Sequence, residues 1–586
     1  MVITVPEDIK FVERKSAFVI NSTQKNMKVV QLIVDYLIRK NIEYVFAVPG
    51  VNIMPLLEEI NKNKKINLVI CKSEQGAAYM ADGYAREHGI GCCIGTTGPG
   101  ITNMYTSVCG CYYDSVPVVF ISAQVNKSDF GKYGIQEMTG LGRTPNVMGA
   151  FKLVTKYAKR IVNKQVVHKC LEDAFAHMME KRKGPVYLEF TEDVLRETIS
   201  NDIEDISIKK RIEEESAVDF NQYMKLLDAL QQCVLPVVVL GNGTRETERK
   251  SIIDFCKRID AMCVCTALVK GKMRKEDYNF LGTIGCYGNI KANKAIEKAD
   301  LIIYLGTSIS YLSMCGWSFD MRNKYQVRVD IDKNVLFSKY KVDLNFCMDI
   351  NIWIKQILLF LEEERIQFEA RKNNVKSICL REEYYEEEEE QYFESDVLDP
   401  VCVMKVINNK INDFDYVVVD VGQNAYWAER YIEIGKKGKF FIHGGMGAMG
   451  YGIAAAIGIK LARKTKGKVV CICGDGGYFM TGNELNTAVN YNADVIWIVM
   501  NNNSLGTQDA WAKKRGYSLN FALTNCNIVL NARSLGVSAK KIRTEDELEQ
   551  NLMLALSGKE SILLDVQISQ KTPKSYYGKN VKNINR

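Results

Sequence analysis

Several features are missing from this 586-residue chain, and each absence excludes a class of protein. No stretch of 18 uninterrupted apolar residues occurs, so a membrane-spanning helix is not expected. The 77 basic and 70 acidic residues are interspersed, with no basic block that alternates with aromatic residues, which argues against nucleic-acid binding. Residues 1–24 carry several charges and lack a long apolar core, so a signal peptide is not expected there.

The chain also lacks a disulfide framework, although it has 18 cysteines. Many of them lie inside apolar runs, where a thiol acts as a small hydrophobic group. The pairs Cys263, Cys265 and Cys471, Cys473 have a Cys-x-Cys pattern without the spacing of a zinc site. Free cysteines in such numbers are typical of a reducing compartment, and we expect a cytoplasmic protein.

The length and the strand pattern predict several α/β domains. At about 150 residues per domain, three or four domains are expected. Three segments alternate short apolar strands with amphipathic helices, which predicts an α/β fold with three doubly wound parallel-sheet domains. The predicted divisions are an N-terminal extension (1–25), a first domain (26–198), a central domain (215–365), an acidic linker (366–396), a third domain (397–570) and a C-terminal tail (571–586).

Individual strands and helices are predicted from short apolar runs. Strands are expected at 44–48, 91–95, 116–121 and 184–190 in the first domain, and a helix at 75–87. In the central domain they are expected at 235–240, 300–305 and 326–332. That domain lacks a full GxGxxG with an acidic residue in register, so dinucleotide binding is only weakly indicated.

The third domain contains the most informative motif. Gly474-Asp475-Gly476 follows the apolar run 469–473, and Asn501-Asn502 follows the run 495–500. Asp475 and Asn502 are 27 positions apart (502 minus 475), enough for a strand, a crossover helix and a second strand. Both side chains are then expected at the carboxyl edge of one parallel sheet, where they could reach one hard cation. The glycines let a phosphate approach the backbone closely.

This motif and the order of the segments resemble the thiamine diphosphate-dependent 2-oxo acid decarboxylases and carboligases. Among these the chain is most similar to the large, catalytic subunits of acetolactate synthases, and the resemblance runs from about residue 26 to 567. It implies thiamine diphosphate and Mg²⁺ as cofactors, with pyrimidine-binding, central and diphosphate-binding domains in that order. Asp475, Asn502 and the backbone oxygen of Ser504 would hold Mg²⁺.

The resemblance also implies the residues that contact the diphosphate. Gly476 and Gly477 would present N–H groups at the start of the following helix. Gly447 would also contact the cofactor, and Met449, two residues later, fits the bulky residue that keeps the cofactor bent. The remaining implied contacts on this side are Gln423, Asn424, Leu505 and Gly506. Acetolactate synthases usually carry histidine where Asn424 stands.

The second half of the implied site lies in the first domain. Glu74 is expected at a strand-to-helix turn, where on its own it would be a helix N-terminal charge. In the family a glutamate here hydrogen-bonds the aminopyrimidine ring and acts as the acid/base group, while the cofactor supplies the carbon chemistry. Thr97 and Gly98 belong to a turn that is similar to the family's Ser/Thr-Gly-Pro-Gly turn. Val51 and Asn52 belong to the loop that would lie over the thiazolium.

Substrate choice is implied to depend on Gln136 and Trp511, together with Val51 and Asn52. Gln136 matches a glutamine near the reacting centre and, with Glu74, is a predicted catalytic residue. The chain departs from acetolactate synthases at Val51 and Asn52, where they often carry small residues, and by an insertion from Gly140 to Pro145. Gly306-Thr307-Ser308-Ile309-Ser310 stands where FAD-binding relatives carry an arginine- and aspartate-rich loop, which argues against FAD.

The implied activity is decarboxylation of a 2-oxo acid, with pyruvate as the expected donor, and transfer of the acyl carbanion to a second carbonyl. Two alternatives stay open: a specialised acceptor such as a keto-sugar, and a decarboxylase that releases an aldehyde. The four histidines include no adjacent pair of the kind that pyruvate decarboxylases use to release aldehyde. A non-catalytic, cofactor-binding member is disfavoured by Glu74 and the metal motif. Because such enzymes divide the cofactor between subunits, a homodimer or homotetramer is implied.

Overall fold

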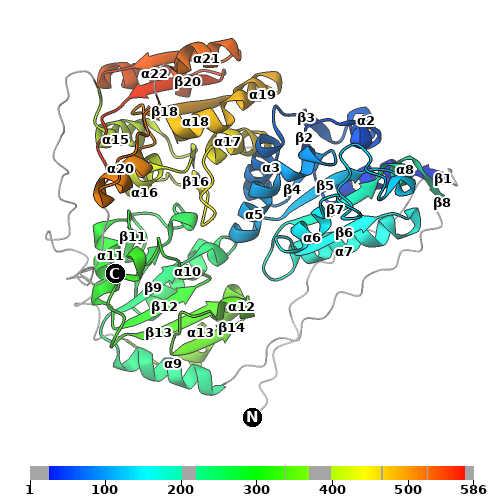
Figure 1. Ribbon diagram of the computed structural model, residues 1–586. Coiled ribbons are helices and arrows are strands. Elements are labelled where there is room, and N and C mark those ends of the chain that lie inside the picture. The colour runs from blue at the N-terminus through cyan, green and yellow to red at the C-terminus, as the bar shows by residue number, and fades with distance from the viewer. Residues whose placement is uncertain are drawn as a thin grey trace.

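The computed structural model describes residues 26–200, 220–336, 338–368, 397–463, 466–523 and 526–573. The predicted N-terminal extension, most of the acidic linker and most of the C-terminal tail lie outside these residues. Figure 1 shows three α/β units, here called the N domain (26–200), the central domain (220–368) and the C domain (397–573). The predicted domain bounds stay predictions.

The N domain is built on a six-stranded sheet in which every neighbouring pair is parallel, in the order β3-β2-β4-β5-β7-β6. Phe46 belongs to one apolar cluster and Val45 and Ala47 to another, so helices cover both faces of the sheet. A short antiparallel pair joins β1 (Asn26–Lys28) to β8 (Thr198–Ser200). The strands are β2 (Tyr44–Ala47), β3 (Asn67–Ile70), β4 (Gly91–Gly95), β5 (Val118–Gln124), β6 (Tyr157–Ile161) and β7 (Val186–Thr191); the helices are α1 (Val29–Arg39), α2 (Met54–Lys62), α3 (Glu74–His88), α4 (Pro99–Thr102), α5 (Tyr105–Asp114), α6 (Val147–Lys152), α7 (Val167–Met179) and α8 (Glu192–Arg196), with a 3₁₀ turn η1 (Val51–Ile53).

The C domain repeats the strand order of the N domain. Its six-stranded parallel sheet runs β16-β15-β17-β18-β20-β19. Numbered in chain order within each domain, both sheets read 2-1-3-4-6-5. The strands are β15 (Tyr416–Val419), β16 (Lys439–Ile442), β17 (Val469–Gly474), β18 (Val495–Asn501), β19 (Ser538–Ile542) and β20 (Ile562–Gln567); the helices are α15 (Pro400–Lys410), α16 (Gln423–Tyr431), α17 (Tyr451–Ala462), α18 (Asp475–Thr481), α19 (Leu485–Asn490), α20 (Gly506–Arg515), α21 (Ile528–Ser534) and α22 (Glu545–Ser557), with a 3₁₀ turn η9 (Gly482–Glu484).

The central domain has a different order, β11-β10-β9-β12-β13-β14, which in chain order is 3-2-1-4-5-6. Dinucleotide-binding sheets share this order and bind ligands where it reverses, between β9 and β12. Here the turns after those strands contact each other, since a Cβ on Gly241 would lie 2.3 Å from the Gly306 oxygen. The strands are β9 (Pro236–Leu240), β10 (Met262–Cys265), β11 (Phe280–Thr283), β12 (Leu301–Leu305), β13 (Tyr325–Asp330) and β14 (Leu344–Cys347); the helices are α9 (Phe220–Gln232), α10 (Arg249–Arg258), α11 (Ile290–Lys298), α12 (Lys333–Leu336) and α13 (Ile350–Glu363).

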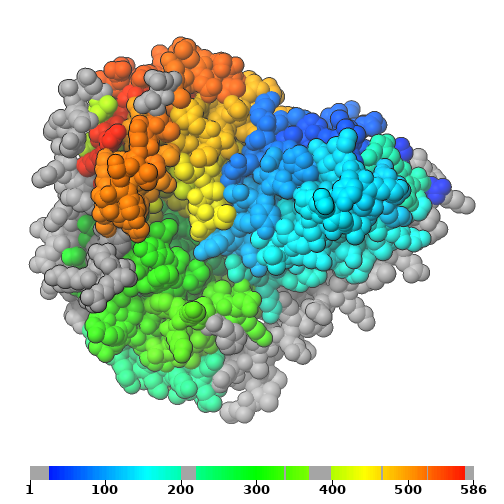
Figure 2. Space-filling view, in the orientation of Figure 1, coloured from blue at the N-terminus to red at the C-terminus, as the bar shows by residue number. Residues whose placement is uncertain are grey.

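The N and C domains share one hydrophobic core, which is centred on helices α3 and α17 (Figure 1). In Figure 2 the blue surface of the N domain meets the yellow surface of the C domain directly. The helix backbones approach very closely: a Cβ on Gly83 would lie 2.4 Å from the Ala455 oxygen, and a Cβ on Gly458 would lie 1.9 Å from the Met80 oxygen. Any larger residue at these glycines would force the helices apart. The two domains of one chain are therefore fixed relative to each other.

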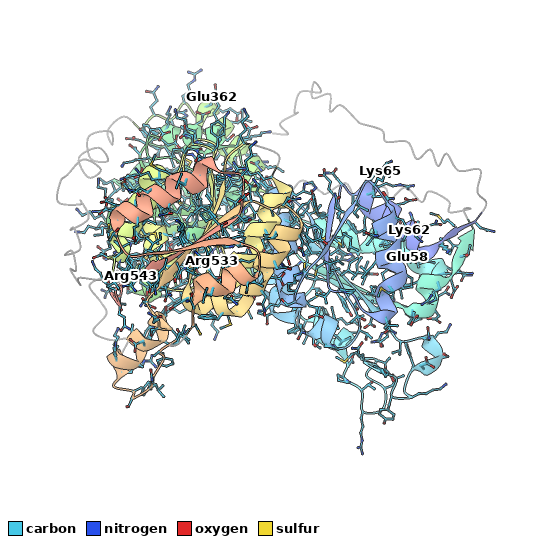
Figure 3. The ribbon with its side chains drawn as sticks, turned by 90° about the horizontal axis from the view of Figure 1, so that it is seen from above. Glu58, Lys62, Lys65, Glu362, Arg533 and Arg543 are labelled. Carbon is cyan, nitrogen blue, oxygen red and sulfur yellow. The ribbon has the colours of Figure 1, made fainter. Side chains whose placement is uncertain are left out.

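The structure confirms the predicted α/β fold with three parallel sheets. The strand expected at 91–95 is β4, and the helix expected at 75–87 is α3, one residue longer at each end. The labelled charged residues of Figure 3 lie at the outer surface, where Glu58 and Lys62 pair at 2.5 Å on α2. Within the described ranges, no helix has the length and apolar character to cross a membrane.

Candidate active site

The three predicted metal ligands converge at the carboxyl edge of the C-domain sheet. Asp475 begins α18 directly after β17, and Asn502 follows the neighbouring strand β18. The Ser504 N–H donates to Asp475 Oδ2 at 3.2 Å and to Asn502 Oδ1 at 3.1 Å. The strand ends therefore bring both side-chain oxygens to one backbone position.

This group has the chemistry of a hard-cation site. Burial raises the pKa of Asp475 to about 6, against the hydrogen bonds that it accepts from the Gly476 and Ser504 N–H groups. A nearby cation would offset that cost of burying the charge. Within the described residues, no three His, Cys, Asp or Glu side chains gather into a metal-binding cluster. A metal here would depend on one carboxylate together with amide and backbone oxygens, a donor set that suits Mg²⁺.

Glycines line the same edge where side chains would not fit. A Cβ on Gly476 would lie 2.5 Å from Leu505 Cδ2 and 3.0 Å from Met449 Cε. A Cβ on Gly506 would lie 2.7 Å from Gln423 Oε1, and the Gln423 amide donates to the Gly506 oxygen at 3.0 Å. The structure thus brings together five predicted cofactor contacts: Gln423, Met449, Gly476, Leu505 and Gly506.

Asp420 is a further buried carboxylate of this edge that the sequence analysis missed. It follows β15 and accepts from the Gly450 and Gly452 N–H groups at 3.0 and 2.9 Å. Burial raises its pKa to about 6, and a Cβ on Gly477 would lie 1.9 Å from its Oδ2. The signal was present, since Asp420 ends an apolar strand as Asp475 does.

Two other predicted contacts in the C domain have different surroundings. The amide of Asn424 is buried and donates to the backbone oxygens of Asp420 and Ile472, so it braces the strand ends. Gly447 has φ +59°, which favours glycine, and a Cβ there would meet no atom within 4 Å. Gly447 therefore borders open space.

In the N domain, Glu74 is the first residue of α3, which confirms the expected strand-to-helix turn. Ser73 caps the helix by accepting from the Gly76 N–H at 3.0 Å. The Glu74 side chain is half-buried, and its Oε2 accepts from the Asn103 amide at 3.0 Å. Asn103 directly follows α4, so this bond ties Glu74 to the turn that contains Gly98.

Thr97, Gly98 and Gln136 form a second contact group. The Thr97 hydroxyl donates to the backbone oxygen of Gln136 at 2.9 Å, and a Cβ on Gly98 would lie 2.8 Å from Gln136 Cβ. Gln136 has φ +64°, a left-handed conformation that is unfavourable for a residue with a side chain. Behind it, the buried Gln124 accepts from the Met138 N–H at 3.3 Å. The loop is therefore held in a strained conformation at a predicted substrate residue.

Val51 and Asn52 lie on η1 beside this group. A Cβ on Gly50 would lie 2.3 Å from Thr96 Cβ, so their loop packs on the turn before Thr97. Val51 is 75% exposed, whereas the Asn52 amide donates to Glu192 Oε2 at 3.2 Å. In this chain the side chain of Asn52 is thus engaged by the start of α8.

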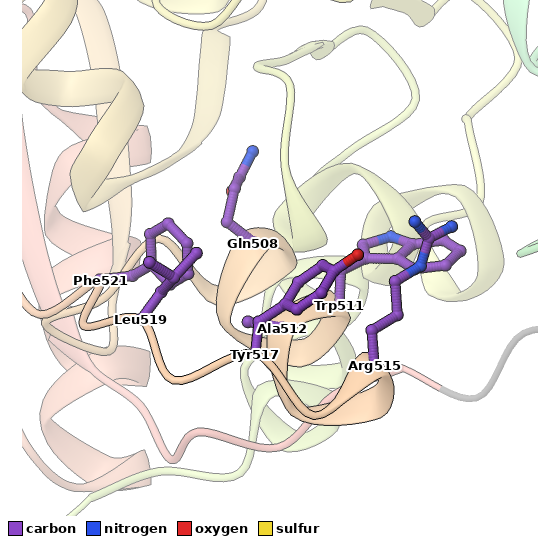
Figure 4. Close-up of a pocket in the computed structure, with 7 residues that line it drawn as sticks. All are labelled: Gln508, Trp511, Ala512, Arg515, Tyr517, Leu519 and Phe521. Carbon is purple, nitrogen blue, oxygen red and sulfur yellow. The ribbon is translucent and has the colours of Figure 1, made fainter.

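Trp511 is surrounded by residues of its own helix and of the segment that follows it. It is on α20, which projects from the body of the molecule in Figure 3, and Lys514 and Arg515 lie over its ring. Its surroundings are a shallow cavity of about 360 Å³ (Figure 4). Every lining residue comes from α20 and the segment after it: Gln508, Trp511, Ala512, Arg515, Tyr517, Leu519 and Phe521. No contact in this set joins Trp511 to the predicted cofactor residues.

The predicted site residues therefore form two half-sites. The C half-site is defined as Asp475, Asn502, Ser504 and the glycine-lined edge around Gly476. The N half-site is defined as Glu74, Thr97, Gly98 and Gln136. The hydrogen bonds that join the members of each half-site lie within one domain.

Comparison with known proteins agrees with this division. The chain matches the family descriptions "Thiamine pyrophosphate enzyme, N-terminal TPP binding domain" over residues 27–142, "central domain" over 224–357 and "C-terminal TPP binding domain" over 420–566. It therefore carries all three domains of the thiamine pyrophosphate (thiamine diphosphate) enzymes and belongs to that family.

Within the family the chain is similar to acetolactate synthase large subunits. It is 28% identical to that of Haemophilus influenzae over 93% of this chain and 95% of the relative. It is 29% identical to that of Lactococcus lactis subsp. lactis over 92% of each chain, and 28% identical to a probable acetolactate synthase large subunit of Methanococcus aeolicus over 90% of each. The likeness spans nearly the whole length, including both half-sites.

Proposed function

We propose that this chain decarboxylates a 2-oxo acid, with pyruvate as the donor, and transfers the acyl group to a second carbonyl, as an acetolactate synthase does. The observation that carries the proposal is the convergence of Asp475, Asn502 and Ser504 at one strand edge. The names of the similar proteins support the carboligase over an enzyme that only releases an aldehyde.

The residues present fit thiamine diphosphate and Mg²⁺. Asp475, Asn502 and the Ser504 backbone oxygen would hold the metal, and the N–H groups that begin α18 would face the diphosphate. Met449 and Leu505 would support the middle of the cofactor. When bound, the cofactor supplies the nucleophilic carbon and the electron sink for C–C bond cleavage. Glu74 would hold and move a proton at the aminopyrimidine ring, and Gln136 would orient the acceptor.

A homodimer, alone or within a tetramer, follows as part of the proposal. Each half-site presents residues of one domain only, and in the proposed assembly a second copy would supply the other half. Large apolar side chains beside both half-sites support this: Ile135 next to Gln136 is 88% exposed, and Met480 in α18 is 55% exposed. Such side chains are expected to be covered in an assembly.

Two smaller parts of the proposal concern the location of the protein and FAD. All the cysteines in the described part of the chain are free, which supports a cytoplasmic location. We leave FAD out, because the central-domain turns at Gly241 and Gly306 contact each other where the strand order reverses. An absorption spectrum of the purified protein tests this choice: a flavin band would contradict it.

The test of function is incubation of the purified protein with thiamine diphosphate, Mg²⁺ and pyruvate, with CO₂ and carbon products measured. We expect CO₂ together with acetolactate. If acetaldehyde were the only product, the simple decarboxylase would be favoured. If CO₂ appeared only when a keto-sugar was added, a specialised acceptor would be indicated. No CO₂ from any simple 2-oxo acid would contradict the proposal.

A further inference from the structure

Glu484 is a fully buried carboxylate that reaches from the C domain into the N domain. It ends η9, and its side chain is 0% exposed. Its Oε1 accepts from the Ser73 N–H at 2.9 Å and from the Ser73 hydroxyl at 3.0 Å. Its Oε2 accepts from the Lys72 N–H at 3.1 Å and from the Thr487 hydroxyl at 2.7 Å. The carboxylate is thus saturated with donors, most of them from the other domain.

These bonds fix the two residues that precede Glu74. Ser73 is the N-cap of α3, and its hydroxyl accepts from Gly76 while it donates to Glu484. A Cβ on Gly76 would lie 2.1 Å from Glu484 Oε1, so the carboxylate fills the space that a side chain would need. Both sides of the first turn are therefore engaged: Glu484 contacts one, and Asn103 holds the Glu74 carboxylate on the other.

Glu484 is one of several groups that join the two domains. α3 and α17 meet through apolar side chains and close glycine contacts, and the Tyr451 hydroxyl of α17 donates to Asp82 Oδ1 of α3 at 2.7 Å. Burying a carboxylate is costly unless hydrogen bonds offset the loss of water, and a helix N-terminus lowers that cost further. Within the described residues, Glu484 is the only buried carboxylate that binds the Lys72–Ser73 backbone. This backbone immediately precedes Glu74, the predicted acid/base residue.

We propose that Glu484 is the positioning residue for Glu74: it fixes the Lys72–Ser73 backbone so that Glu74 meets the aminopyrimidine ring in one orientation. This inference rests on the proposed function. Glu484 itself contacts neither cofactor nor substrate and acts only through the turn. Its loss should impair proton transfer at the cofactor while the C half-site still binds the diphosphate.

The test compares Glu484→Gln with the matched control Tyr491→Phe in full-length protein. The Gln amide replaces an acceptor with a donor that faces other donors. Tyr491 makes a different hydrogen bond across the same interface, accepting from the Ile70 N–H at 2.7 Å. It lies close to the turn but does not hold Ser73.

Two readouts separate positioning from general weakening. In the protein without cofactor, hydrogen–deuterium exchange of the peptide around residues 70–76 should rise in Glu484→Gln beyond any rise in Tyr491→Phe. In the loaded protein, deuterium exchange at the cofactor's C2 position, followed by NMR, should slow about 10- to 100-fold in Glu484→Gln and stay at the wild-type rate in Tyr491→Phe. Thiamine diphosphate affinity, measured by calorimetry, should stay close to wild type in both.

Wild-type C2 exchange in folded Glu484→Gln, or equal slowing in both variants, would overturn the inference. If Glu484→Gln does not fold, Thr487→Val is the second test, because it removes only the hydrogen bond from Thr487 to Glu484. C2 exchange about threefold slower than in wild type would support the inference, and an unchanged rate would refute it. A failure of the proposed function would look different. Wild type would then exchange the C2 proton rapidly but form no product from 2-oxo acids. The C2 exchange rate would still be slower in Glu484→Gln than in Tyr491→Phe.

Discussion

The two half-sites stand on sheets of the same strand order, yet they are built differently. The C half-site consists of strand-end oxygens, glycines and buried carboxylates, and the pKa values of Asp475 and Asp420 are raised to about 6 by burial. The N half-site consists of a helix-start glutamate and a strained loop at Gln136. The C half-site is suited to holding charge, and the N half-site holds its side chains and loop in fixed positions. In the proposed function, one topology serves binding in one domain and chemistry in the other.

The sharpest test of this division is Glu74→Gln. Because the carboxylate is the proposed acid/base group, we expect turnover to fall by about 10²- to 10⁴-fold, with thiamine diphosphate affinity nearly unchanged. Steady-state CO₂ release and calorimetric titration measure the two quantities. Glu87→Gln, at the other end of α3, is the control and should keep turnover. Normal turnover in Glu74→Gln would remove the chemistry from the N half-site.

Asp475→Asn tests the opposite half. Loss of the buried carboxylate should weaken thiamine diphosphate binding in Mg²⁺ by at least about 100-fold, and raising both cofactors should recover part of the turnover. Removing Mg²⁺ with a chelator should have the same effect on wild type. The control is Asp565→Asn, a buried carboxylate on β20 that accepts from the Asn501 amide at 2.8 Å and should leave cofactor affinity unchanged. An equal loss in both variants would point to damage of the sheet instead.

The buried acids of the C domain should also make its stability depend on pH. Burial raises the pKa of Glu429 on α16 from 4.5 to about 7, although Lys270 opposes the shift. The folded state therefore keeps a proton that the unfolded state loses, and this contribution to stability, present below pH 4.5, is lost as the pH rises through 7. The loss amounts to about 3 kcal/mol.

Glu429→Gln should lose the part of the pH dependence that Glu429 contributes, so the variant should exceed wild type in thermal stability at pH 8 and match it near pH 4.5. Thermal unfolding at several pH values measures the difference. Glu433→Gln is the control, because Glu433 is exposed and pairs with Lys275 at 3.0 Å; its pH dependence should be that of wild type. Parallel curves for Glu429→Gln and wild type would contradict the prediction.

The smallest effect concerns the strain at Gln136. Gln136→Ala and Gln136→Gly both remove the side chain, but only glycine adopts φ +64° without strain. The glycine variant should therefore be more stable than the alanine variant by about 1 kcal/mol, measured by denaturant unfolding. Both should form less carboligation product per CO₂ than wild type. If the product ratio stayed normal in both, Gln136 would not contact the acceptor.

Sequence could predict the C half-site better than the N half-site, for a physical reason. Asp475 and Asn502 end buried strands, and parallel strands bring such ends together by geometry alone. Asp420 obeys the same rule and could have been found. The hydrogen bond from Ser73 to Glu484 joins residues 411 positions apart and depends on how the two domains dock, so no local sequence pattern predicts it. The surroundings of Asn52 and Trp511 likewise depend on loop packing.

Asp475 and Glu484 are the two ends of one short helical segment, α18 followed by η9. One end belongs to the C half-site, and the other holds the turn of the N half-site in the same chain. In the proposed homodimer these half-sites would belong to different reaction centres. The segment would then link the two centres thermodynamically, and such coupling is reciprocal. Cofactor binding at one centre would change the cofactor affinity of the other centre, and binding at the second would change the affinity of the first by the same factor. Cooperative cofactor binding would be its signature.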